Sequence, residues 1–320
     1  MDHRVQISIA MATFNGEKFL RQQLDSIQSQ TFKDYELIIG DDCSSDHTLD
    51  ILKEYAAKDP RIQIIVNKTN LGFKKNFENI LSKCTGAYIA FCDQDDIWEN
   101  NHLEFLYSHI NQYDCIGCNA NFINEHEKSL NTSMMDFLKI HDIPKSTDAF
   151  LKFELFANMI QGSASLFTHD LVSKALPFPR NIKFHDYWLA LNACTRKGCV
   201  YYNKSILSYR RHSCNVTEYQ KFNLIRALKK ISRLSKDKKT YYIDNINVLE
   251  NLKYRLGSST NLTRISEALV FYKNLSNNTH RLKTLLYYII HYKSISRSNY
   301  INLPVFFFRI FTIAVFGIKY

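Results

Sequence analysis

The most informative stretch of the sequence is Phe91-Cys92-Asp93-Gln94-Asp95-Asp96-Ile97-Trp98. The apolar run 87–92 predicts a buried strand, and helix-like sequence follows from Glu99. Three carboxylates therefore stand where a strand emerges from the core. Carboxylates packed this closely raise one another's pKa unless they share a cation, so the pattern indicates a divalent-metal site. The alternative is an acidic turn, in which Asp96 caps a helix that begins at Ile97.

The composition is that of an ordinary globular protein, with 45% hydrophobic and 22% charged residues in a chain of 320. The net charge of +10 is unevenly placed. Residues 1–215 carry 23 Lys and Arg against 26 Asp and Glu, whereas residues 216–320 carry 18 against 5. The sequence therefore predicts one domain over 1–215 and a basic, mostly helical region over 216–320. The N-terminus lacks the features of a signal peptide, which favours a cytoplasmic location.

Strand-like runs alternate with helix-like segments over the first part of the chain, and these runs are 5–12, 35–40, 62–66 and 87–92. Such alternation favours right-handed crossovers and a mainly parallel sheet with helices on its faces, which is an α/β fold. Ligands of such sheets bind at the carboxyl ends of the strands. Polar residues gather at these predicted ends, namely 13–15, 41–42, 67–72 and 93–96. Their convergence favours a nucleotide and metal site over separate helix caps.

The sequence contains no glycine-rich phosphate loop of either common type, so a metal ion bound to Asp95 is expected to hold the phosphates. Segments 12–17, 41–48, 70–73 and 93–98, in that order, resemble the nucleotide-sugar-binding half of family 2 glycosyltransferases with the GT-A fold. The resemblance covers about the first two thirds of the chain. Cys43 departs from the glycine usual in the family, which weakens the turn argument at that position.

The resemblance implies a set of residues for the nucleotide-sugar donor and the metal. Asp41 and Asp42 would contact uracil or thymine, and the D-x-D motif of Asp93 and Asp95 would hold the diphosphate and a divalent metal, Mg²⁺ or Mn²⁺. The full donor set is Thr13, Phe14, Asn15, Glu17, Asp41, Asp42, Asn70, Gly72, Asn76, Asp93, Gln94 and Arg210.

Two later segments complete the expected site. Asp186 stands at the start of an amphipathic helix, where the alternative is a plain N-cap, and the resemblance implies that it is the catalytic base of an inverting transfer. Next to it, Tyr187 and Trp188 are expected to stack on a sugar or to pack in the core. His212 resembles the family's late histidine, which implies a ligand of the metal or the diphosphate. The small, apolar run 161–167 indicates close approach to a ligand or tight packing.

The basic region predicts contact with a membrane surface. Residues 222–234 place apolar side chains on one side of a helix and Lys and Arg on the other. The apolar run 303–316 contains Arg309 and falls short of the ~20 residues needed to span a bilayer. We therefore expect a peripheral protein on the inner face of the cell membrane, with contact between two copies in a homodimer as the competing explanation.

Motif likeness within the family is greatest to bacterial rhamnosyltransferases, which implies transfer of L-rhamnose from dTDP-L-rhamnose to a hydroxyl of a lipid-linked polysaccharide. A UDP-hexose donor is the alternative. A nucleotidyltransferase is less favoured, because residues 13–16 do not form a basic, glycine-rich loop. A nucleic-acid-binding protein is also less favoured, because the basic region interleaves its charges with long apolar runs.

Overall fold

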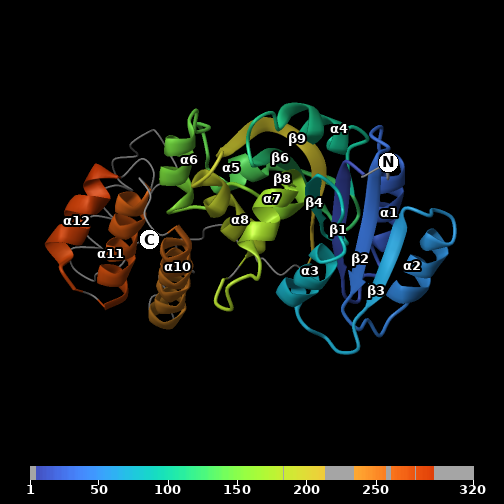
Figure 1. Ribbon diagram of the computed structural model, residues 1–320, viewed down its shortest axis with the longest axis horizontal. Coiled ribbons are helices and arrows are strands. Elements are labelled where there is room, and N and C mark those ends of the chain that lie inside the picture. The colour runs from blue at the N-terminus through green and yellow to red at the C-terminus, as the bar shows by residue number, and fades with distance from the viewer. Residues whose placement is uncertain (1–4, 183, 213–233, 257–260, 278, 292–320) are drawn as a thin grey trace. The chain divides into compact units, whose positions relative to one another are not determined.

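The structure, a computed structural model, describes residues 5–182, 184–212, 234–256, 261–277 and 279–291. The chain divides into two compact units (Figure 1). The first comprises Met1–Glu154, Asn158–Phe178 and Phe184–Arg211, and the second comprises Leu155–Ala157, Pro179–Lys183 and His212–Tyr320. The basic helix expected over 222–234, apart from Leu234, and the apolar run 303–316 lie outside the described residues.

The first unit is built on one sheet, whose strand order is β3-β2-β1-β4-β8-β6-β9-β5, with β7 paired to β6. The strands are β1 Ile7–Thr13, β2 Tyr35–Asp41, β3 Ile62–Val66, β4 Tyr88–Cys92, β5 Ile97–Trp98, β6 Cys115–Asn124, β7 Ser129–Ser133, β8 Ser165–Thr168 and β9 Cys199–Arg211. Strands β1 to β4 are mutually parallel, whereas β8 runs antiparallel to both β4 and β6. The predicted α/β fold is confirmed, with a mixed sheet that is parallel in its first half.

Helices pack against this sheet, and the resulting burial accounts for the apolar residues of its strands. All seven residues of β2 are buried, as expected for a central parallel strand that is covered on both faces. On one face α3 packs against β1 and β2, and elsewhere α7 contacts β4 and β8 while α8 contacts β9. The helices are α1 Leu20–Gln28, α2 Thr48–Ala56, α3 Phe73–Leu81, α4 His102–His109, α5 Met134–Leu138, α6 Thr147–Glu154, α7 His169–Ala175 and α8 His185–Cys194, with a short 3-10 helix, η1, at Gly162–Ala164.

The segment after the acidic turn corrects one expectation. Ile97–Trp98 forms β5, which pairs antiparallel with β9, and the following helix, α4, begins only at His102. The predicted helix from Ile97 was therefore wrong, and Asp96 does not cap it. Local periodicity could not reveal this strand, because its partner lies far along the chain. The pairing brings the end of β9 next to the acidic turn.

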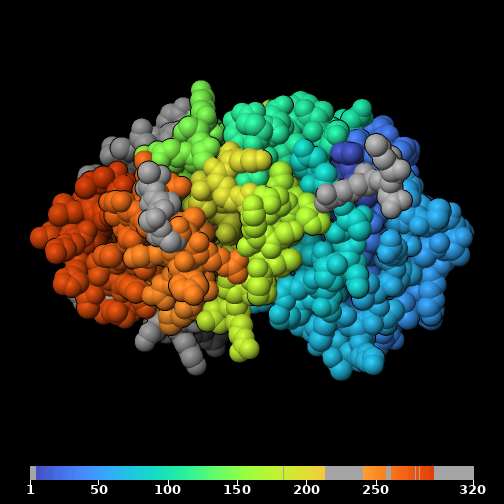
Figure 2. Space-filling model, in the orientation of Figure 1, coloured from blue at the N-terminus to red at the C-terminus, as the bar shows by residue number. Residues whose placement is uncertain are grey.

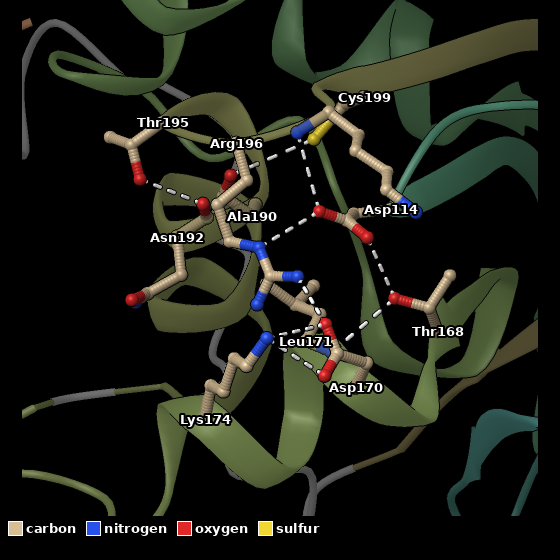
Figure 3. A network of polar contacts seen from close by, with 11 residues as sticks. Asp114, Thr168, Asp170, Leu171, Lys174, Ala190, Asn192, Thr195, Arg196 and Cys199 are labelled. Atoms are coloured by element: carbon tan, nitrogen blue, oxygen red, sulfur yellow. Dashed lines mark hydrogen bonds and ion pairs between the residues drawn. The ribbon is translucent and has the colours of Figure 1, made fainter.

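A buried ion pair ties the far end of α8 to the sheet (Figure 3). Asp114, at the start of β6, is fully buried; it accepts a hydrogen bond from Thr168 Oγ1 at 2.8 Å and lies 3.1 Å from Arg196 Nε. Arg196 also contacts Asp170 on α7. Because Arg196 lies two residues after α8, its buried pair with Asp114 fixes the C-terminal end of that helix.

The described part of the second unit contains three helices, α10 Leu234–Leu256, α11 Leu262–Asn277 and α12 Arg281–Ile290, which Figure 2 shows in orange to red. Their shared core contains Leu249, Leu252, Ile265 and Tyr272, all fully buried. Within the described ranges we find no helix with the length and apolarity needed to cross a bilayer.

Candidate active site

The loops after β1 and β2 are fastened together by side chains from the predicted donor set. Thr13 Oγ1 donates to Asp41 Oδ1 at 3.2 Å, and Asn15 Oδ1 accepts the backbone N–H of Ser45 at 2.9 Å. The carboxylate of Glu17 accepts the backbone N–H of His47 at 2.9 Å. These bonds give the two strand ends one shared loop structure.

The neighbouring aspartates at the end of β2 are both buried and bond to the protein itself. The Asp41 carboxylate accepts hydrogen bonds from the backbone N–H and the hydroxyl of Ser44, at 3.0 and 2.6 Å. The Asp42 carboxylate accepts the backbone N–H groups of Leu71 and Gly72, both at 2.8 Å. Each carboxylate therefore organises a loop at the edge of the sheet where the uracil or thymine of the donor is expected. A direct contact of either carboxylate with this nucleobase stays a prediction.

The loop before α3 is shaped by residues of the predicted set. Gly72 has a φ of +78°, a conformation that favours glycine, and forms the N-cap of α3. Asn70 Oδ1 accepts the Gly72 N–H at 3.1 Å. Asn76 is buried, and its Nδ2 donates to the carbonyl oxygen of Gly40 at 2.7 Å. Asn76 Oδ1 also accepts a hydrogen bond from Asn67 Nδ2 at 2.9 Å, so Asn76 ties α3 to β2 and to the residue after β3, and its contact with the donor stays a prediction.

The middle residue of the D-x-D motif links two strand ends. The Gln94 amide accepts the backbone N–H of Phe14 at 2.8 Å and donates to the Phe14 carbonyl at 3.1 Å. A Cβ at Gly16 would lie 2.3 Å from Gln94 Oε1, so a side chain there would displace the Gln94 amide from its bonds to Phe14. The arrangement leaves the Phe14 side chain 45% exposed.

Asp93 directly follows β4, and its side chain is exposed to solvent. The surrounding protein nevertheless desolvates the carboxylate and raises its pKa to about 7, with further repulsion from Asp95 and Asp186. The Ser163 hydroxyl donates to Asp93 Oδ2 at 2.9 Å and partly offsets this effect. An ionised Asp93 is thus costly unless a cation lies nearby.

Asp96, the last carboxylate of the acidic turn, is fully buried. Its Oδ1 accepts the backbone N–H of Arg210 at 3.1 Å, whereas its Oδ2 has no hydrogen-bond partner. Burial, followed by repulsion from Asp95 and Asp93, raises the pKa of Asp96 well above its usual range. A bound cation would relieve the repulsion among these carboxylates, and a metal at this turn stays a prediction.

Arg210 lies beneath the acidic turn, and this differs from the expected contact with the diphosphate. The side chain is fully buried, and Nε donates to the Asp95 carbonyl at 2.8 Å while Nη2 donates to Gln22 Oε1 at 2.6 Å. The guanidinium also lies over the ring of Phe19, 4.6 Å from its centroid. Sequence reasoning recognised the charge but not these protein acceptors. Arg210 braces the turn, and in this conformation its side chain does not face a phosphate.

Asp186 lies in the first turn of α8, where Phe184 and not Asp186 is the N-cap residue. Its Oδ2 accepts the backbone N–H of Gly162 at 3.1 Å, and Oδ1 accepts that of Tyr187 at 2.6 Å. Burial nevertheless raises the pKa of Asp186 to about 6. Such a carboxylate is ionised at neutral pH and still basic enough to take a proton.

The short helix η1 connects the two halves of the site. Gly162 donates to Asp186 and Ser163 donates to Asp93, so consecutive residues hold the candidate base and the first carboxylate of the D-x-D motif. Neither Gly162 nor Ser163 was among the predicted site residues. The signal was the small, apolar run 161–167, which indicated close packing near a ligand without naming a role.

The family follows from comparison with known proteins. Residues 8–171 match the model of "Glycosyl transferase family 2", which is about half of the chain. The chain belongs to glycosyl transferase family 2. As a glycosyltransferase it moves a sugar from a nucleotide donor, and this decides against a nucleotidyltransferase and a non-catalytic nucleic-acid-binding protein.

Similar proteins agree with this assignment. An uncharacterized glycosyltransferase of Haemophilus influenzae is 28% identical over 259 residues, which cover 78% of this chain and 77% of that protein. A structure of S. aureus TarS with UDP-GlcNAc has a TM-score of 0.59 at 16% identity, over 91% of this chain and 81% of that chain. The mannosyltransferase PcManGT of Pyrobaculum calidifontis, with GDP-Man and Mn²⁺, has a TM-score of 0.55 at 11% identity, over 98% and 82%. The structural likeness confirms the predicted GT-A fold.

The aromatic residues beside Asp186 belong to the core of this glycosyltransferase. Trp188 is fully buried and its Nε1 donates to the Ala175 carbonyl at 3.0 Å, so it does not stack on a sugar. His185 packs between Phe77 and Phe91, with ring centroids 4.4 and 4.5 Å away. Burial lowers the pKa of His185 to about 3, so it stays neutral beside the candidate base.

The metal ligands are only partly defined by the described residues, among which no group of three His, Cys, Asp or Glu side chains lies close enough to hold an ion by itself. His212 is the first residue after β9 and belongs to the second unit. Its role as a metal ligand stays a prediction.

Proposed function

We propose that this glycosyltransferase moves a sugar with inversion from a nucleotide-diphosphate donor to a hydroxyl group of a glycan. The observation that supports the proposal is η1, which joins Asp186 to Asp93 through Gly162 and Ser163. One carboxylate with a raised pKa thus lies close to the carboxylates of the D-x-D motif. An inverting transfer needs a general base on one side of the reacting carbon and a site for the leaving diphosphate on the opposite side.

Asp186 would act as the general base. As the acceptor oxygen attacks the anomeric carbon, the bond from that carbon to the diphosphate oxygen breaks, and the hydroxyl proton passes to the Asp186 carboxylate. The bonds from Gly162 and Tyr187 orient the carboxylate, and a pKa of about 6 leaves it ionised at neutral pH. The single attack from the opposite face inverts the configuration.

Asp95, with Asp93 and His212, would hold a divalent cation, Mg²⁺ or Mn²⁺, jointly with the donor diphosphate, because these three side chains do not form a complete site by themselves. When bound, this ion supplies Lewis-acid stabilisation of the charge that develops on the leaving diphosphate. The mutual repulsion of Asp93 and Asp95 and the unpaired Asp96 oxygen support this assignment. The fold is shared with PcManGT, whose structure contains Mn²⁺, and this supports the same type of ion.

The donor would lie on the loops that follow β1, β2 and β3. Thr13, Asn15 and Glu17 shape the first loop, Asp41 and Asp42 the second, and Asn70, Gly72 and Asn76 the third, while Phe14 presents an exposed ring. Motif likeness favours dTDP-L-rhamnose as the donor. A UDP-hexose is the second candidate, and the shared fold of TarS, which was solved with UDP-GlcNAc, favours testing it.

The acceptor would be a lipid-linked bacterial polysaccharide at the inner face of the cell membrane, to which the protein attaches peripherally. The excess of 18 Lys and Arg over 5 Asp and Glu in residues 216–320 supports attraction to anionic lipid.

A donor screen tests the proposal. Release of the nucleoside diphosphate is measured with dTDP-L-rhamnose and with UDP-hexoses, each with Mg²⁺, with Mn²⁺ and with chelator. We expect one donor to react and chelator to abolish its turnover. The Asp186→Asn variant is compared with Asp170→Asn, which alters an exposed carboxylate on α7. Full activity of Asp186→Asn would refute the assignment of the base.

A further inference from the structure

Helix α12 carries large apolar side chains on its exposed side. Leu282, Leu286, Ile289 and Ile290 are 70, 50, 41 and 75% exposed, whereas Thr284 and Tyr288 on the other side are buried. These spacings place the four exposed residues within one arc of the helix, which we call the α12 face. A helix on the surface of a domain normally carries polar residues on its solvent-exposed side. The exposed apolar residues of the α12 face therefore indicate a surface that binds an apolar partner.

A groove adjoins this helix. It has a volume of about 640 Å³ and is lined by residues of α10, α11 and α12, including Lys283, Thr284 and Tyr287 from α12. Val270 and Phe271 contribute apolar surface, and Lys253 contributes a second ammonium group. Apolar walls together with two lysines suit an anionic amphiphile, although Glu267 also lines the groove.

The charge around these features has the same sign. Residues 234–291 contain nine Lys and Arg against four Asp and Glu, and α12 contains Arg281 and Lys283 but no acidic residue. Lys273 pairs with Glu250 at 2.6 Å. In the part of the chain that the structure describes, neither Lys253 nor Lys283 forms such a pair. Their charge is available to an anionic partner.

We infer that the α12 face and the adjoining groove dock on an anionic lipid bilayer. The apolar side chains enter the boundary between headgroups and acyl chains, and Lys253 and Lys283 meet lipid phosphates. This inference rests on the peripheral membrane attachment proposed above and supplies the surface for it. A second copy of the chain fits less well, because two positively charged surfaces would face one another.

The test is co-sedimentation of the full chain with phosphatidylcholine vesicles that contain or lack phosphatidylglycerol. We expect binding that requires the anionic lipid. The double variant Leu286→Gln and Ile290→Gln should weaken binding by roughly tenfold or more, because it removes two exposed apolar anchors. The double variant Lys253→Gln and Lys283→Gln should weaken it by roughly tenfold at low salt, with less effect at high salt.

Matched controls change the same residue types elsewhere. Leu130→Gln alters an apolar side chain that is 40% exposed on β7, and Lys83→Gln with Lys128→Gln removes two exposed lysines of the first unit. These variants should bind vesicles within about twofold of the wild-type chain. Equal thermal unfolding midpoints of all variants show that each one is folded.

Three outcomes would overturn the inference: equal binding to both kinds of vesicle, unchanged binding of both α12 and lysine variants, or conversion of a dimer to a monomer by the α12 variant with unchanged vesicle binding. The last outcome would assign the face to a second copy. Asp186→Asn should bind vesicles as the wild-type chain does. Failure of the docking surface is thereby separated from failure of the transfer reaction.

Discussion

Arg210 Nε donates a hydrogen bond to the carbonyl oxygen of Asp95 at 2.8 Å, and the backbone N–H of Arg210 donates to the neighbouring carboxylate of Asp96. One residue at the end of β9 therefore fixes two consecutive residues of the acidic turn. Because the direction of the Asp95 carboxylate follows from its backbone, a residue without access to the ligand sets the position of the candidate metal site.

Arg210→Lys tests this positioning role. Lysine keeps the charge but loses the planar set of N–H donors that reaches Asp95, Gln22 and Glu125. We expect about a tenfold or greater rise in the metal concentration required for half-maximal turnover, and a smaller change in the KM of the donor at saturating metal. Both constants are measured by release of the nucleoside diphosphate. Arg211→Lys is the control, and an Arg210→Lys enzyme with unaltered metal dependence would contradict the role.

The pKa of Asp186 predicts the acid limb of the pH profile. The base must be ionised to accept a proton, so kcat/KM should be constant at alkaline pH and fall tenfold per pH unit below about 6. The profile is measured at saturating metal. Asp170→Asn should leave it unchanged, because Arg196 and Lys174 lower the pKa of Asp170 to about 2. If the residual activity of Asp186→Asn still falls below about pH 6, the acid limb of the profile belongs to another group.

The same carboxylate is expected to destabilise the fold. Its pKa rises from 3.8 to about 6 on folding, so the folded state binds the proton more tightly, and the ionised form costs stability. This cost is absent below pH 3.8 and complete above pH 6. Asp186→Asn should therefore raise the free energy of unfolding at pH 7.5 by on the order of 1–2 kcal/mol, a value reduced for the solvent contact of the side chain. Urea titration at pH 7.5 and at pH 4 checks this, since most of the gain should be lost at the lower pH.

The ion pair behind α8 should matter for stability. Arg196→Met leaves Asp114 buried with only its hydrogen bonds, and we expect a loss of about 2–3 kcal/mol in the free energy of unfolding. Lys174→Met removes an exposed partner of Asp170 and should cost less than about 1 kcal/mol. Urea titrations of both variants give the comparison. Equal losses of unfolding free energy in the two variants would mean that the buried ion pair stabilises the fold no more than the exposed one.

The sequence predicted those features that local patterns encode. Strand β3 was predicted with its observed ends, and the C-terminal ends of β1, β2 and β4 were predicted within one residue, because apolar runs there stop at turn-forming residues. The start of β1 was predicted two residues too early. Features that depend on contacts between residues far apart in the sequence were not predicted. Ile97–Trp98 became a strand only through β9, and Ser163 acquired its role only by lying beside Asp93. Arg210 was recognised as a cation, but its burial depends on Gln22 and the acidic turn, which are remote in sequence.

The pair of hydrogen bonds between the Gln94 amide and the backbone of Phe14, which lies against Gly16, has a practical meaning for protein engineering. These positions form one exchangeable module, because a longer or shorter side chain at 94 would leave the Phe14 peptide without its partner, and a side chain at 16 would displace the Gln94 amide. Swapping donor preference between relatives by transplanting the first loop alone is therefore expected to fail. Gln94, which stands between the two aspartates predicted to bind the metal, has to be exchanged together with that loop.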